Sequence, residues 1–228
     1  MNFLELVRDL YKESGESFSG GATATNADSS AVSYDALVAG WINAEWLSIQ
    51  GLCAQWRWMW SEFNLTITSG VQDASLPTPT GKRSAIKSVD WGSGASLEPA
   101  SDSTDYRYLI YLPYEGNEAV FRHASSGRPT HITQLPNGRI RFNRIPDQDY
   151  VLRGEGWLAP WSMTANADTP DMPERFHRLI VLGALLDHAR WEASPEQLQI
   201  AMEQRRTLLG RMRRAEMPGP HYVVEALA

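Results

Sequence analysis

The sequence contains very little cysteine, with Cys53 alone among 228 residues. A single thiol excludes an internal disulfide, and its apolar neighbours indicate packing rather than a nucleophile. Long hydrophobic runs are also missing: no stretch reaches the ~18 uninterrupted apolar residues that a membrane-spanning helix needs. The N-terminus lacks a basic segment followed by an apolar one. We therefore expect no signal peptide, no membrane partner and synthesis in a reducing cytoplasm.

Positive charge is scarce as well. The chain carries 21 lysines and arginines against 27 aspartates and glutamates, a formal net charge of −6 at pH 7. Proteins that wrap DNA or coat anionic membranes need clustered cations. The composition argues against both roles, although it allows DNA to pass nearby. A hydrophobic content of 43% is typical of a globular protein with a sizeable core.

Motifs for catalysis or for cofactor and metal binding are missing too. The glycine-rich stretch 15–31 has no Gly-Lys-Ser or Gly-Lys-Thr, so it does not match a phosphate-binding loop. His177 and His188 are eleven residues apart in one predicted helix, which is too far for both to bind one metal ion. We therefore expect no enzyme and no catalytic, cofactor-binding or metal-ligating residue.

What is present is a long helical pattern over residues 33–63, which has no proline and holds five of the nine tryptophans. At ~1.5 Å per residue it predicts a single helix roughly 40 Å or more long. Trp58 and Leu47 project from its polar side, which indicates a second contact surface. Glu45 lies within the apolar arc, and a buried carboxylate needs a partner.

The remaining periodicity divides the chain into three parts. A short helix over residues 2–13 precedes a loop, and from Asn64 the period changes to two, as in β-strands. The alternating segments include 85–91, 106–112, 130–134, 139–143 and 150–152, with an Asn-Gly hairpin signal at 137–138 and loops at 78–81 and 92–104.

Helical signals return at Asp171 and continue to about Trp191. Leu182 and Leu185 spread the apolar character around this helix, which indicates contact on more than one side. Ser194 and Pro195 then begin a last helix that ends before residue 218. This last helix gathers a cluster of arginines, namely Arg205, Arg206, Arg211, Arg213 and Arg214.

These elements predict an α+β fold. Residues 1–63 and 170–217 should form one antiparallel bundle of about four helices. Residues 64–169 should form a small antiparallel β-rich insertion between the second and third helices. Residues 218–228 are too short to fold alone and should form an extended C-terminal arm.

Two groups of charged residues have alternative interpretations. Glu45, Asp187 and Arg190 are either a structural ion pair network that fixes helix register or carboxylates for acid and base chemistry, and the lack of a pocket signature favours the first. The arginine cluster is a nucleic-acid surface, a contact surface for an acidic partner, or a set of cations that complement the helix dipole and pair with Glu203 and Glu216, and we favour the last.

The order of the motifs resembles the head-to-tail adaptor proteins of tailed bacteriophages. The motifs that carry this resemblance are Met-Asn-Phe-Leu-Glu-Leu-Val at 1–7, Val-Ala-Gly-Trp-Ile-Asn at 38–43, Ile-Gln at 49–50, Trp-Arg-Trp at 56–58, Gly-Arg-Pro at 127–129, Gly-Arg-Ile at 138–140, Ile-Pro-Asp at 145–147 with Tyr150, and Pro-Asp-Met-Pro-Glu-Arg-Phe-His at 170–177. Their order extends over nearly the whole chain.

The resemblance implies a structural virion protein without a reaction. Such adaptors stand as a ring of typically about twelve copies beneath the portal protein, where they extend the DNA channel and carry tail or nozzle proteins. The implied portal-binding arm consists of Pro218, Pro220, His221, Tyr222, Val223 and Val224. We expect a subunit interface at Trp58, Leu47, Leu182 and Leu185, and DNA passing without sequence-specific binding. The alternatives are a tubular tail or neck component below the adaptor, and a nucleic-acid-binding protein that uses the arginine-rich helix.

Overall fold

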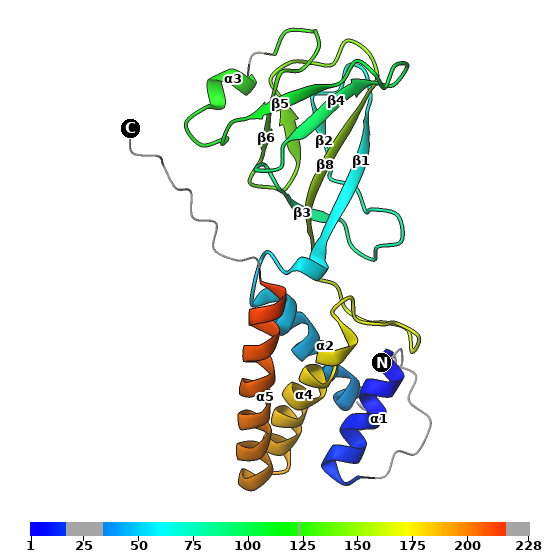
Figure 1. Cartoon of the computed structure of the whole chain (residues 1–228), viewed down its shortest axis with the longest axis vertical. Coiled ribbons are helices and arrows are strands. Elements are labelled where there is room, and N and C mark those ends of the chain that lie inside the picture. Colours follow the sequence, from blue (N-terminus) through cyan, green and yellow to red (C-terminus); the bar gives the residue numbers. More distant parts are fainter. Residues whose placement is uncertain (17–33, 123, 218–228) are drawn as a thin grey trace. The chain divides into compact units, whose positions relative to one another are not determined.

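A computed structural model describes residues 1–16, 34–122 and 124–217 (Figure 1). The chain divides into two compact units. The helical unit consists of Met1–Met59 and Pro160–Ala228, and the sheet unit consists of Trp60–Ala159. Two parts of the sequence that are a hundred residues apart therefore pack together, and the segment between them folds as a unit of its own.

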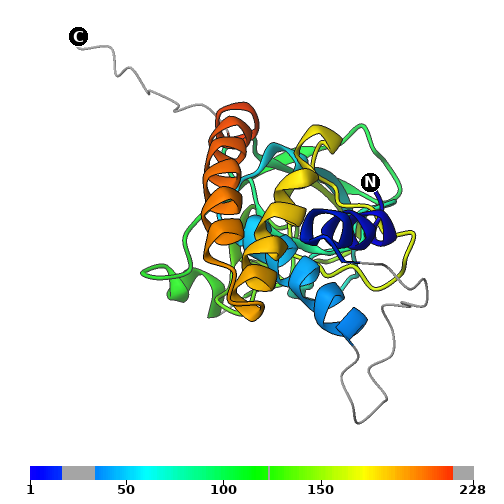
Figure 2. The ribbon, with the colours of Figure 1, turned by 90° about the horizontal axis from the view of Figure 1, so that it is seen from below.

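Four α-helices build the described part of the helical unit. The N-terminal part of the chain supplies α1 (Phe3–Ser14) and α2 (Tyr34–Gly51), and the C-terminal part supplies α4 (Arg178–Trp191) and α5 (Pro195–Glu216). Two 3-10 turns, η1 (Arg57–Met59) and η2 (Glu174–Phe176), accompany them. The other three helices all pack against α4, and Figure 2 shows α4 between α1 and α5. The central helix is therefore α4.

The ends of α1 are fixed by its sequence. Asn2 accepts a hydrogen bond from the Glu5 N–H at 2.9 Å, and the Glu5 carboxylate accepts one from the Asn2 N–H at 2.8 Å, which is a capping box. At the other end Gly15 has φ 81°, a left-handed conformation that favours glycine. The Glu16 N–H then donates to the Tyr11 carbonyl at 3.1 Å, so this closing turn also fixes the backbone of Glu16.

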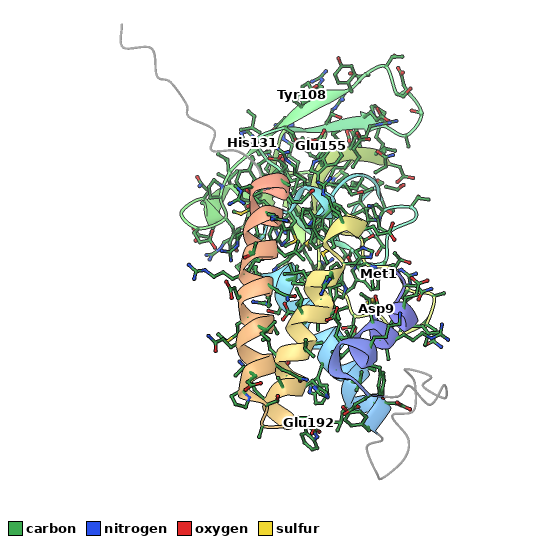
Figure 3. The ribbon with its side chains drawn as sticks, turned by 60° about the horizontal axis from the view of Figure 1, so that its bottom comes forward. Met1, Asp9, Tyr108, His131, Glu155 and Glu192 are labelled. Atoms are coloured by element: carbon green, nitrogen blue, oxygen red, sulfur yellow. The ribbon has the colours of Figure 1, made fainter. Side chains whose placement is uncertain are left out.

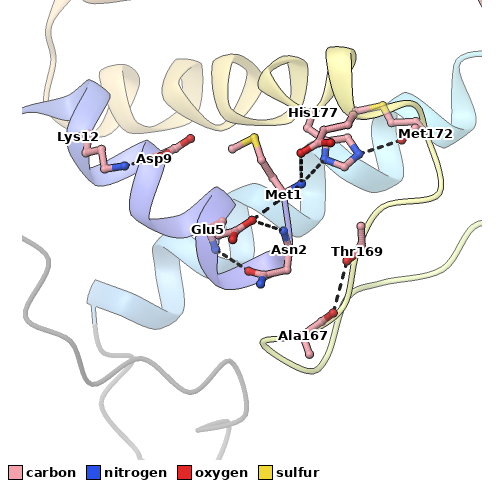
Figure 4. A network of polar contacts seen from close by, with 10 residues as sticks. Met1, Asn2, Glu5, Asp9, Lys12, Ala167, Thr169, Met172 and His177 are labelled. Carbon is pink, nitrogen blue, oxygen red and sulfur yellow. Dashed lines mark hydrogen bonds and ion pairs between the residues drawn. The ribbon is translucent and has the colours of Figure 1, made fainter.

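The start of α1 is tied to η2 through a buried histidine (Figure 4). The amine of Met1 donates to Nδ1 of His177 at 3.1 Å and also contacts Glu174 at 3.2 Å. His177 Nε2 donates to the Met172 carbonyl at 2.8 Å. Burial lowers the pKa of His177, because removal from water disfavours the charged ring. The neutral His177 thus links the N-terminal and C-terminal segments of the helical unit.

The predicted single helix over 33–63 is wrong, because α2 ends at Gly51 and a strand begins at Trp60. Trp56 is fully buried, and its indole N–H donates to the Ile49 carbonyl at 2.9 Å. Carbonyls in the last turn of a helix lack partners within that helix. The apolar residues that prolonged the helical pattern therefore pack back against the end of α2 instead of extending it.

The polar side of α2 holds the segment that returns from the sheet unit. Asn43 makes two hydrogen bonds of 2.9 Å with the backbone of Met163, one as donor and one as acceptor. Gln50 does the same with the backbone of Trp161, at 3.0 Å in each case. The two amides are seven residues apart and so lie on one face of the helix. Each amide pairs with a backbone N–H and C=O of the extended segment, as the backbone of a neighbouring strand would.

The sheet unit contains eight strands and one short helix in its described residues. The elements are β1 (Trp60–Ile67), β2 (Asp73–Ala74), β3 (Ile86–Val89), β4 (Ala95–Pro99), β5 (Arg107–Tyr111), α3 (Glu118–Arg122), β6 (His131–Gln134), β7 (Ile140–Phe142) and β8 (Tyr150–Leu158). The strand order is β1-β8-β4-β5-β6-β7-β2, and β3 also pairs with β8. All the strand pairs are antiparallel except β5 with β6.

The predicted fold class, a helical bundle with a small β-rich insertion, is therefore wrong. The fold is mixed, with a nearly closed, barrel-like sheet of eight strands and five helices among the described residues. Short alternating segments do not show how many strands meet in one sheet, and β4 lies inside the predicted loop 92–104. The predicted hairpin at Asn137 and Gly138 is confirmed, since it connects β6 to β7.

Gly183 leaves room for a side chain that crosses α4. A Cβ atom at this position would overlap Cγ and Cδ of Glu45, which reaches over α4 from α2. The Glu45 carboxylate accepts hydrogen bonds from Nη2 and Nε of Arg205 on α5, at 2.6 and 3.0 Å. One ion pair thereby connects α2 and α5 across the backbone of the central helix.

We predict that Gly183→Ala destabilises the protein by about 1–3 kcal/mol, the usual cost of overpacking an interior. The new methyl group displaces the Glu45 carboxylate and so breaks its bonds to Arg205. Urea unfolding followed by circular dichroism measures the effect. Gly210→Ala on α5 is the matched control, because its nearest neighbour atom would be 3.9 Å away. The control should be neutral or slightly stabilising, and equal losses in both variants would contradict the argument.

Candidate assembly surface

One side of α5 packs against α4, while its other sides are largely uncovered within the helical unit. Of its 22 residues only Ala201, Met212 and Glu216 are buried. Ile200 and Met202 are 59% and 55% exposed. Figure 1 shows α5 at the edge of the unit, beyond α4. Large apolar side chains on an open helix indicate a surface that another molecule covers.

Two grooves follow the flanks of α5, and each mixes apolar residues with arginines. The larger groove has a volume of about 730 Å³. It is lined by Leu186 of α4 and by Gln199, Met202, Glu203, Arg205, Arg206, Leu209, Gly210 and Arg213 of α5. The smaller has a volume of about 430 Å³. It is lined by Arg178 and Leu182 before α5 and by Ile200, Glu203, Gln204, Thr207, Leu208 and Arg211 on α5.

Most of the arginine cluster has no carboxylate partner within the described chain. Arg205 pairs with Glu45, but no described ion pair involves Arg206, Arg211, Arg213 or Arg214, all of which are exposed. The expected pairing of the cluster with Glu216 does not form, because Glu216 is buried and pairs with Arg175 of η2 at 2.8 Å. The open side of α5 therefore carries four cations that are available to an outside partner.

The four residues expected at a subunit interface lie in different environments. Leu182 and Leu185 are only 2% and 7% exposed, because three helices surround α4, so we withdraw both from the interface. Trp58 is half-buried and stacks on Trp46 and Trp56, with centroid distances of 5.3 and 6.0 Å. Leu47 is 39% exposed. Apolar residues all around a helix can thus mean a central helix rather than an oligomer contact.

The charged residues expected to form one network divide into two pairs. Glu45 pairs with Arg205, whereas Asp187 pairs with Arg190 at 3.0 Å in a solvent-exposed contact on α4. Burial raises the pKa of Glu45 above its ordinary value of 4.5, and the hydrogen bonds and charge of Arg205 oppose this rise. The charge of Asp187 adds to the rise. Arg205, which the sequence assigned to the arginine cluster, is therefore the partner of the buried carboxylate.

The sheet unit has an exposed apolar row of its own. Tyr108 and Ile110 lie on the outer face of β5, and Tyr106 precedes them with the same alternation. Tyr108 is 69% exposed, and Figure 3 shows it at the surface of the sheet unit. These residues are not among the site residues predicted from the sequence. The sequence does carry a signal for this row: the side chains on both faces of the strand are mainly apolar. In a strand with one face in water, apolar and polar side chains alternate.

The expected portal-binding residues, Pro218, Pro220, His221, Tyr222, Val223 and Val224, lie outside the described residues. Among the residues that are described, no helix combines the length and the apolar character needed to cross a membrane.

Among the described residues, the open flanks of α5, the half-buried Trp58 and the outer face of β5 present apolar side chains to solvent. The chain matches the family model described as SU10 adaptor protein over residues 1–223, so it belongs to this family of phage adaptor proteins. It is accordingly a component of a phage virion. A comparison with curated protein sequences found no match.

The raised pKa of Glu45 predicts a pH-dependent stability. The folded chain binds the Glu45 proton more tightly than the unfolded chain does, so this contribution is full below about pH 4.5 and is lost as the pH rises through the folded-state pKa. Glu45→Gln removes the titration. We expect the free energy of unfolding of the native chain, minus that of the variant, to fall as the pH rises. Urea unfolding at a series of pH values measures it, and a difference that is constant or increases would contradict this account.

Proposed function

We propose that this protein is a structural head-to-tail adaptor without enzymatic activity. Copies of it stand as a ring beneath the portal protein, extend the DNA channel and provide the surface to which the tail attaches. Membership of a phage adaptor family supports the general role. The exposed face of α5 and the apolar row on β5 support contacts with more than one partner.

The observation that carries this proposal is the open helix α5. Copies in a closed ring meet through two different surfaces, because each contact joins one side of a subunit to another side of the next. The two flanks of α5 differ in this way, since Met202 and Leu209 line one groove and Ile200 and Leu208 line the other. Apolar residues framed by arginines are typical of protein interfaces, in which arginine is enriched.

The net charge supports a channel that lets DNA slide. A chain with a charge of −6 does not hold phosphate groups strongly. The alternative function, nucleic-acid binding through the last helix, is favoured by the four exposed arginines without a described ion pair. Binding of a short DNA duplex at several salt concentrations separates the two roles. Affinity that falls steeply with salt supports the alternative, whereas weak binding throughout supports the adaptor.

We predict that the protein alone is a monomer or weak oligomer and joins a stoichiometric ring when portal protein is added. Met202→Glu should weaken this assembly at least about tenfold, because a carboxylate then enters an apolar contact. Size-exclusion chromatography with light scattering, with and without portal protein, measures it. Val71→Glu is the matched control, since Val71 is similarly exposed but belongs to the sheet unit. Unchanged assembly of the Met202 variant would exclude this face of α5 from the ring contact.

We further predict that deleting residues 218–228 abolishes docking onto the portal protein and leaves the fold intact. The deletion starts after the end of α5 at Glu216 and removes none of the core residues described above. Co-sedimentation with portal protein measures docking, and thermal unfolding measures the fold. Full docking by the shortened chain would show that the arm is elsewhere.

A further inference from the structure

Three potential metal ligands meet where α1 and α4 end. A carboxylate oxygen of Glu16, a ring nitrogen of His188 and a carboxylate oxygen of Glu192 all lie within 4.8 Å of one another. His188 Nε2 is 3.3 Å from Oε1 of Glu16. Figure 3 labels Glu192 at this end of the helical unit. The three residues come from two helices that are far apart in the sequence.

The backbone at all three positions is fixed. His188 and Glu192 are four residues apart at the end of α4, which places them on one face, and the Glu192 N–H donates to the His188 carbonyl at 2.9 Å. The closing turn of α1 around Gly15 holds Glu16, whose N–H donates to Tyr11. Small changes in the two glutamate side chains are therefore sufficient to bring the three groups around a single ion.

The surroundings concentrate negative charge at this corner. Among the described residues, no ion pair with a lysine or arginine involves Glu16 or Glu192. Each carboxylate also lies just beyond the C-terminus of a helix, where the helix dipole is negative and favours a cation. Two carboxylates held this close repel each other unless a positive charge joins them.

His188 adds an independent observation. Its side chain is almost completely buried and packs edge-on against the Trp41 ring, with a centroid distance of 6.0 Å. Its Nδ1 has no hydrogen-bond partner among the described residues. The one polar contact found for the ring therefore points toward Glu16 and Glu192. The buried imidazole therefore presents one ring nitrogen to two carboxylates, and this combination of donors is one that metal ions take.

We propose that Glu16, His188 and Glu192 bind a divalent transition metal ion, with Zn²⁺ as the best match. One imidazole and two carboxylates suit this ion, which takes nitrogen ligands at ~2.0–2.1 Å and oxygen ligands at ~2.0–2.2 Å. In tetrahedral geometry these bond lengths separate two ligand atoms by about 3.3 Å, which is the separation of His188 Nε2 and Glu16 Oε1. Water completes the coordination. The ion connects the end of α1 to the end of α4.

Titration of the full-length protein with Zn²⁺ tests the site, after removal of any histidine tag. Calorimetry should show one equivalent bound, the melting temperature should rise because the ion binds only the folded chain, and Co²⁺ should give the absorption bands of tetrahedral coordination. Glu16→Gln and Glu192→Gln keep the side-chain shapes and should each weaken binding at least about tenfold. Both positions reach solvent, so the variants should fold, which circular dichroism checks.

Asp187→Asn is the matched control. Asp187 precedes His188 on α4 and carries the same charge, but its carboxylate pairs with Arg190 instead of facing the cluster. Its Zn²⁺ affinity should equal that of the native chain. The proposal is overturned if the native chain shows no saturable binding at one equivalent, or if the two glutamine variants bind Zn²⁺ as tightly as the control.

Discussion

The ion pair between Glu45 and Arg205 governs the arrangement of the helical unit, because it spans the central helix from one side to the other. It forms only where α4 presents Gly183 to the crossing carboxylate. Burying the two charges costs solvation energy that their attraction only partly offsets, which the raised pKa of Glu45 reflects. The pair therefore adds more to the specificity of the helix positions than to stability. It connects α2 to α5 at the level of Gly183 on α4.

The sheet unit depends on a different constraint, the central position of β8. This strand pairs with β1, β3 and β4, so three segments separated in the sequence use one strand as their template. Its length of nine residues allows this sharing, since β1 pairs along nearly the whole strand, while β4 pairs with residues 150–153 and β3 with residues 156–158. The outer face of β5 lies two positions along the sheet from β8. The exposed tyrosines thus have a stable support, although the strand that carries them is short.

Local signals in the sequence predicted much of this structure. The short first helix, the Asn-Gly hairpin and the Ser194-Pro195 start of α5 each depend on a few neighbouring residues, and the structure confirms these elements. The errors concern contacts between distant residues. Helical spacing alone did not show that Trp56 folds back onto α2, or that α4 is enclosed on three sides. The ion-pair partner of Glu45 lies 160 residues away, and no local pattern identifies such a partner.

The pairing of β1 with β8 affects how the chain reaches its folded state. The ladder begins at Trp60 opposite Trp157, so the points where the polypeptide leaves and re-enters the helical unit are held about one strand spacing apart, roughly 4.8 Å. Once this ladder has formed, the hundred residues of the sheet unit no longer separate α2 from α4 as a flexible loop would. The free energy of strand pairing then offsets the entropy lost in closing that loop, before the helices meet. The inserted unit thereby acts as a noncovalent crosslink between the two segments of the helical unit.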